Sequence, residues 1–153
     1  MPLPELPAYL SLFLVALGAA TVLPVLASEP VVVAMILAGR YAPVNVWLVA
    51  SLGNTCGAAI NWGLARYALH WRDRPWFPVR PEQLQRAADW FQRYGRWSLL
   101  FSWLPVVGDP LTFAAGLLRV NFAWFLILVA TGKAARYAAL VWLTLRGAQG
   151  WSG

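Results

Sequence analysis

Two carboxylates and two cations lie inside apolar stretches of the sequence, where charged side chains are rare. Glu29 and Asp109 each precede a proline, and Lys133 and Arg136 lie three residues apart within the last apolar stretch. Residues at this spacing share one face of a helix, so both cations can reach the same site. An acid at membrane depth can carry a proton, and a neighbouring cation offsets the cost of its charge. These residues therefore predict a substrate or proton site in which Lys133 pairs with Asp109 or Glu29.

A structural role is the alternative for both acids. Each can be the N-cap of the helix that follows it, with the proline in the first turn. Serine caps a helix as well as an acid does, and Ser28 stands next to Glu29, so capping alone does not account for a carboxylate at membrane depth. Arg40, Arg66 and Arg119 are expected to anchor the chain at the membrane interface. Pairing of Arg40 or Arg119 with an acid is the other possibility.

The composition places these residues in an integral membrane protein. Of the 153 residues, 60% are hydrophobic and 12% are charged, and that charged fraction is about half of the usual one. So short a chain cannot hide this much apolar surface from water, which excludes a soluble enzyme, a disordered chain and a secreted disulfide scaffold. One cysteine and one histidine exclude an internal disulfide and clustered metal ligands, so no metal and no cofactor are expected.

The stretches without charge locate the apolar segments. They include residues 6–28, 30–39 and 41–65, and a spanning helix needs about 20 apolar residues. The first and third stretches are long enough, and the second is too short. A transmembrane helix is expected over about 44–69. Its Gly53-Asn-Thr-Cys-Gly57 segment is typical of close helix packing, with Gly53, Asn54 and Gly57 at the contact.

A basic linker separates the two apolar halves. Residues 66–96 contain seven arginines, and this excess places the linker in the cytoplasm by the positive-inside rule. The segment Pro81–Tyr94 predicts a helix that ends before Gly95. Its apolar residues fall on one face and its charged residues elsewhere, which is typical of a helix lying on the membrane surface. The apolar face consists of Leu84, Ala87, Ala88 and Phe91.

The two halves repeat each other. Leu-Pro-Val followed by an acid and a proline occurs at residues 23–30 and again at 104–110. Proline cannot continue a regular helix, so each motif predicts a break within an apolar segment. About ten residues of helix rise only about 15 Å, half of the hydrocarbon thickness, which favours a re-entrant hairpin. The residues that make the breaks are Pro24, Pro30, Pro105, Gly108 and Pro110.

The predicted fold is therefore all-α and integral to the membrane. One domain over residues 1–153 contains two inverted repeats, about 6–69 and 97–146, joined by the linker 70–96. Each repeat is a re-entrant helical hairpin plus a transmembrane helix, and the linker carries the interfacial helix. Such inverted repeats are typical of transporters. The competing interpretation makes 6–27 an ordinary spanning helix and 31–39 a loop.

The motifs resemble those of the DedA family, also called the VTT or SNARE-associated membrane protein family, in its YqaA-like branch. The resemblance rests on the segment from Phe101 to Thr112, on Ala115-Gly116, Gly132-Lys133 and Arg136-Tyr137, and on the Gly53–Gly57 and Trp62–Arg66 segments. It implies two opposed hairpins and a bacterial inner-membrane location. It also implies proton-linked transport or leaflet translocation of a lipid or lipid-linked substrate in membrane homeostasis.

The resemblance carries the family's membrane acid over onto Glu29. The family's paired arginines do not carry over, because Ser102 and Gly108 stand about where they would be and Asp109 is new. Membrane lipids and protons are the expected partners, with no nucleic acid, and a homo-oligomer is compatible with the glycine segment. The alternatives to a transporter are a structural or assembly protein without a substrate and, less favoured, an intramembrane hydrolase; no enzymatic activity is predicted.

Overall fold

The computed structural model describes residues 5–21, 27–67, 80–104 and 107–150, and these residues are helical or lie in short connections. Pro24, Pro105 and the linker residues 68–79 lie outside the described residues. Within the described ranges, α6 alone is long and apolar enough to cross a membrane, over Phe122–Gln149. The helices are α1 (Leu6–Ala19), α2 (Glu29–Leu37), α3 (Pro43–Tyr67), α4 (Pro81–Tyr94), the 3-10 helix η3 (Gly95–Trp103), α5 (Gly108–Leu117) and α6 (Phe122–Gly150).

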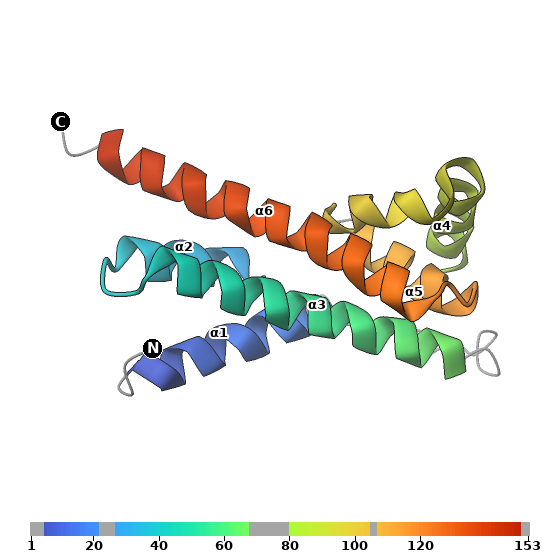
Figure 1. The fold of residues 1–153 in the computed structure, drawn as a ribbon, viewed down its shortest axis with the longest axis horizontal. Coiled ribbons are helices and arrows are strands. Elements are labelled where there is room, and N and C mark those ends of the chain that lie inside the picture. Colours follow the sequence, from blue (N-terminus) through green and yellow to red (C-terminus); the bar gives the residue numbers. More distant parts are fainter. Residues whose placement is uncertain (1–4, 22–26, 68–79, 105–106, 151–153) are drawn as a thin grey trace.

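The two longest helices, α3 and α6, run along the length of the molecule and contact each other (Figure 1). Helix α1 runs from one end toward the middle, and α2 returns toward that same end (Figure 1). At the other end, η3 runs inward and α5 runs back outward, with α4 beside them (Figure 1). Each long helix therefore has short helices against both of its halves.

The chain breaks its helix before Glu29, as the repeat predicts. Helix α1 has 14 residues, which corresponds to about 21 Å of rise and is shorter than the hydrocarbon core of a bilayer. Residues 29–37 form a helix, with Pro30 in its first turn. The competing interpretation, a spanning helix over 6–27 and a loop over 31–39, is therefore wrong. A proline is tolerated in the first turn because its missing N–H has no partner there anyway.

Helix α3 has close to the expected bounds, but it is less apolar than a spanning helix. Its buried side contains polar residues, and two of them bond to the end of α1. The Asn54 amide nitrogen donates to the carbonyl of Ala16 at 3.1 Å, and that of Asn61 donates to the carbonyl of Ala20 at 2.7 Å. These side chains lower the mean hydropathy of α3 while facing protein, so its crossing of the membrane stays a prediction.

Two glycines bring α1 and α3 together. A Cβ atom at Gly57 would overlap the carbonyl oxygen of Leu17 and lie 2.8 Å from the Cβ of Ala20. A Cβ atom at Gly53 would lie 3.1 Å from the Cβ of Ala16. The contact is therefore made within one chain, and the two glycines are not a free face for association between chains.

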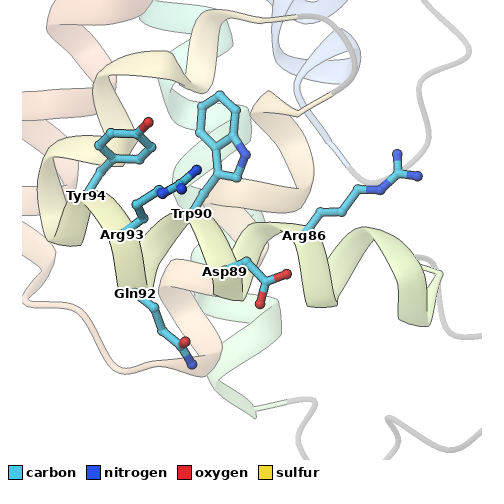
Figure 2. Close-up of a pocket in the computed structure, with 6 residues that line it drawn as sticks. All are labelled: Arg86, Asp89, Trp90, Gln92, Arg93 and Tyr94. Carbon is cyan, nitrogen blue, oxygen red and sulfur yellow. The ribbon is translucent and has the colours of Figure 1, made fainter.

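Helix α4 begins and ends where the sequence predicts. Gly95 follows it with a φ of 56°, a left-handed conformation that stops a helix. Ala87 is 1% exposed and Phe91 packs against the same apolar cluster. Figure 2 shows Trp90 and Tyr94 on one side of the helix and Asp89 and Gln92 on another. One face of α4 thus packs on the protein and the polar face is exposed.

The apolar side chains form two clusters, one in each half of the molecule. The first joins α1, α2, α3 and α6 through residues such as Leu12, Val32, Val46 and Tyr137. The second joins α3, α4, η3, α5 and α6 through residues such as Ala58, Leu99, Leu111 and Phe125. Between them, the middle of α6 carries the two cations Lys133 and Arg136.

Candidate functional site

Glu29 and Arg136 form an ion pair in which a nitrogen of the guanidinium donates to a carboxylate oxygen. Glu29 is the first residue of α2, and Arg136 lies near the middle of α6. The two side chains are only 32% and 25% exposed. The pair joins the start of a short helix to the helix that is long enough to cross the membrane.

Lys133 contacts a different partner from the one expected. Its ammonium donates to the side-chain oxygen of Asn54 on α3, and the residue is 2% exposed. Among the described residues no acid forms a direct ion pair with Lys133, so the expected pairing with Asp109 or Glu29 is replaced by this bond. The physical reason is the contact between α3 and α6, which places a fixed amide opposite the lysine.

Asp109 lies close enough to Lys133 and Arg136 to interact with both charges electrostatically. It is the second residue of α5, whose N-cap is Val107. In the described part of the chain no direct ion pair involves Asp109. One acid of the site is thus bonded to a cation, and the other interacts with the cations at longer range.

Neither acid is an N-cap, which corrects the structural alternative. The N-caps of α2 and α5 are Ser28 and Val107, and neither makes a side-chain cap bond. Ser28 instead shares a hydrogen bond of 2.6 Å with the hydroxyl of Tyr137 on α6, and both residues are fully buried. The proline pattern predicted that α2 and α5 begin at Pro30 and Pro110. Both helices begin one or two residues earlier, so the two acids lie inside the first turn.

Sequence reasoning missed the roles of Ser28 and Tyr137 and assigned Asn54 to helix packing alone. Tyr137 follows Arg136 directly, so the neighbouring residues Ser28-Glu29 and Arg136-Tyr137 face each other as two adjacent pairs. Tyr137 is adjacent to the predicted site residue Arg136, and this adjacency could have indicated that Tyr137 also belongs to the site. The partnership of Asn54 with Lys133 has no such local signal.

The three arginines that were expected to anchor the chain lie at the surface. Arg40, Arg66 and Arg119 are exposed. The guanidinium of Arg40 lies 4.9 Å from the ring centre of Tyr41, and that of Arg66 lies 5.1 Å from the ring centre of Trp62. Within the described ranges no ion pair links these arginines to an acid, and the anchoring role stays a prediction.

The predicted breaks lie beside the site. Pro30 and Pro110 are in the first turns of α2 and α5, and a Cβ atom at Gly108 would overlap the carbonyl oxygen of Ser102. Gly108 therefore lets α5 start directly against the end of η3. Pro24 and Pro105 are the two break residues that lie outside the described part of the chain.

A cavity of about 420 Å³ lies between η3 and α6 and has Arg136 in its wall. The rest of its wall is mostly apolar, with Leu100 and Trp103 from η3 and Ala135 and Ala139 from α6. A second hollow, of about 530 Å³, is lined by side chains of α4, shown in Figure 2. The first contains a residue of the candidate site, whereas the second contains none. No group of three or more potential metal ligands occurs among the described residues.

The apolar composition and the long apolar helix α6 are those of an integral membrane protein. The chain belongs to the VTT domain family, the DedA family, whose model matches residues 23–145. It is 38% identical to the protein called "Inner membrane protein YqaA" of Escherichia coli, over 92% of this chain and 94% of the relative. The protein of the same name from Shigella flexneri has the same identity and coverage.

A more distant relative bears a functional name. The chain is 25% identical to "Undecaprenyl phosphate transporter A" of Staphylococcus aureus, over 72% of this chain and 60% of that protein. No solved structure matches the chain. The family and the membrane location predicted from the sequence are thereby confirmed.

Proposed function

We propose that the protein is a transporter that moves a lipid or a lipid-linked substrate between the leaflets of the inner membrane, coupled to protons. The observation that carries the proposal is the Glu29–Arg136 ion pair on the membrane-length helix. Ionisable residues at membrane depth are costly and mark substrate or proton pathways. The name of the distant staphylococcal relative supports a lipid carrier as the class of substrate.

Two opposed re-entrant hairpins make up the proposed architecture, in repeats of about 6–69 and 97–146 within one domain. Helices α1 and α2 approach the middle from one end, and η3 and α5 approach it from the other (Figure 1). Helices α2 and α5 have 9 and 10 residues, too few to cross a bilayer. In this architecture their N-termini bring Glu29 and Asp109 to the midplane, where transporters of this type bind substrates.

The ion pair can exchange its anion. An anionic headgroup binds the fork of the Arg136 guanidinium with two parallel hydrogen bonds and displaces Glu29. The freed carboxylate then takes up a proton, because an unpaired ion at this depth is costly. The headgroup replaces the charge of Glu29 on Arg136, so the net charge of the occupied site is unchanged. Substrate and proton bind together in this scheme, which links transport to the proton gradient.

Lys133 and Asp109 complete the site. Lys133 is held by Asn54 and adds a second positive charge near Arg136. Asp109 opposes both cations, so the empty site has two positive and two negative groups. The arrangement does not favour an intramembrane hydrolase: two acids that share a proton need to touch each other, and Glu29 is bonded to Arg136.

Leaflet exchange in liposomes tests the proposal. Purified protein is reconstituted, and the movement of a fluorescent lipid phosphate between leaflets is followed with and without a proton gradient. The wild type is expected to accelerate exchange, and Glu29→Gln to lose the acceleration by at least about tenfold. Glu82→Gln, an exposed acid of α4, is the matched control and keeps the wild-type rate. Exchange no faster than in protein-free liposomes overturns the proposal in favour of a structural or assembly role.

A further inference from the structure

The cavity between η3 and α6 has the character of a hydrocarbon site. Its volume of about 420 Å³ is within the range of about 300–1,000 Å³ of pockets that bind small molecules. Leu100, Trp103, Ala135 and Ala139 provide apolar walls. Thr131 also lines the cavity, and its hydroxyl donates to the carbonyl of Ile127 at 2.7 Å within its own helix.

The cavity opens to the surface of the protein. Trp103, Thr131, Ala135 and Ala139 are all exposed. Its floor is closed, because η3 and α6 touch there: a Cβ atom at Gly132 would lie 2.7 Å from the carbonyl oxygen of Leu100. The groove is therefore closed toward the interior of the protein and open at its apolar outer side. A lipid chain can enter it from the bilayer.

Among the described residues that line this cavity, Arg136 alone is charged. Its guanidinium is also the cation that holds Glu29. The rest of the described wall is mostly apolar, so the complementary ligand has a hydrocarbon portion and an anionic end. A ligand with a neutral end leaves the Glu29–Arg136 pair intact, and a ligand without a chain leaves the apolar wall unfilled.

We propose that the groove between η3 and α6 binds the hydrocarbon chain of the transported amphiphile while its anionic head lies on Arg136. This inference rests on the proposed function and deepens it by naming where the chain lies and how the substrate arrives. The substrate enters from the bilayer through the open side of the groove, with its hydrocarbon chain along η3 and α6. Its anionic head reaches the Glu29–Arg136 pair by this route and does not enter from the aqueous phase.

Photo-crosslinking tests the groove. The probe is hexadecyl phosphate with a diazirine in its chain, added to the full-length protein in nanodiscs, and the crosslinked residues are mapped by mass spectrometry. Crosslinks are expected on Leu100, Trp103 or Ala139. The same chain with a hydroxyl head is expected to crosslink there at least about tenfold less, since it lacks the charge-assisted bonds to Arg136.

A matched pair of variants tests the position of the chain. Ala139→Trp fills the groove, whereas Ala138→Trp places the same side chain at an exposed neighbouring position that does not line it. Ala139→Trp is expected to abolish crosslinking in the groove and slow leaflet exchange, and Ala138→Trp to leave both near wild type. Equal membrane abundance and equal melting temperatures of the two variants show that the fold is kept.

The failures of the two proposals are distinguishable. Crosslinks elsewhere, equal effects of the two tryptophans, or equal crosslinking by the hydroxyl-headed probe each overturn the groove, and the proposed function stands if the wild type still exchanges lipids. Crosslinks in the groove without any leaflet exchange overturn the proposed function and leave the groove as a lipid-binding site.

Discussion

The ammonium of Lys133 on α6 is bonded to the side-chain oxygen of Asn54 on α3, so a neutral amide holds a cation that is 2% exposed. The amide nitrogen of the same asparagine donates to the carbonyl of Ala16 on α1 at 3.1 Å. That second bond fixes the orientation of the amide and aims its oxygen at α6. Asn54 therefore links three helices and positions Lys133 near the Glu29–Arg136 pair.

Asn54→Leu is expected to destabilise the protein because it leaves the buried ammonium of Lys133 without its acceptor. Loss of a hydrogen bond to a charged group costs about 1.5–3 kcal/mol, and unfolding in detergent, followed by circular dichroism, measures the change. Asn45→Leu, on the same helix but not bonded to Lys133, is the control and is expected to have a smaller effect. The double variant Asn54→Leu/Lys133→Met is expected to lose less stability than the sum of the two single variants. Additive losses contradict the bond.

The glycines of α3 allow a sharp comparison of crowded and open positions. Gly57→Ala is expected to lower the melting temperature, since its methyl group overlaps the backbone of α1. Gly63→Ala has open space around its new methyl group and is expected to be neutral or stabilising, by up to about 1 kcal/mol, because alanine favours the helix. A thermal melt of both variants in the same detergent decides the point. Equal behaviour argues against the contact of α1 with α3.

Local patterns predicted the elements of this fold well. The helix over Pro81–Tyr94 was predictable because its starting proline and its apolar period lie within the segment and Gly95 follows it directly. The break before Glu29 was predictable for the same reason, since a proline stands at the start of α2. Such signals depend only on residues that are close in the sequence, so they can be recognised without knowing how the helices pack.

The partners within the site were not predictable in the same way. Lys133 and Asn54 are 79 positions apart, and Glu29 and Arg136 are 107 apart. The sequence placed both cations on one face of α6, but the rotation of that helix against α2 and α3 decides which cation meets the acid. An acid is the partner expected for a buried lysine, whereas a neutral amide gives no signal in the sequence. The bond between Asn54 and Lys133 was therefore not predicted.

The basic linker predicts the orientation of the chain in the membrane. We expect cysteines placed singly at Arg93 and Arg119, in a Cys56→Ser background, to be labelled from the cytoplasmic side. Arg93 is on α4, Arg119 follows α5, and both are exposed. Helices α4 and α5 lie at the same end of the molecule (Figure 1). A membrane-impermeant maleimide applied to intact cells and to inverted vesicles measures the accessible face. Labelling of the two positions from opposite faces contradicts the hairpin formed by η3 and α5.

Asp109→Asn separates the charge of the acid from its place in the helix. The N-cap of α5 is Val107, and no side-chain cap bond is present, so the amide, with the same shape as the acid, is expected to leave α5 intact. The substitution removes the negative charge that opposes Lys133 and Arg136. The site then has two cations and one acid. Its net positive charge holds a bound anion and opposes the release of that anion.

Leaflet exchange is therefore expected to fail in Asp109→Asn, while membrane abundance stays near that of the wild type. Asp89→Asn, an exposed acid of α4 that accepts a hydrogen bond from Gln85 at 3.1 Å, is the control and keeps full activity. Lys133→Met is expected to be compensated in abundance by Asp109→Asn, because a neutral pair at this depth costs less than one isolated charge. Full activity in Asp109→Asn contradicts a role of the Asp109 charge in transport. Asp109 would then have only a structural role at the start of α5.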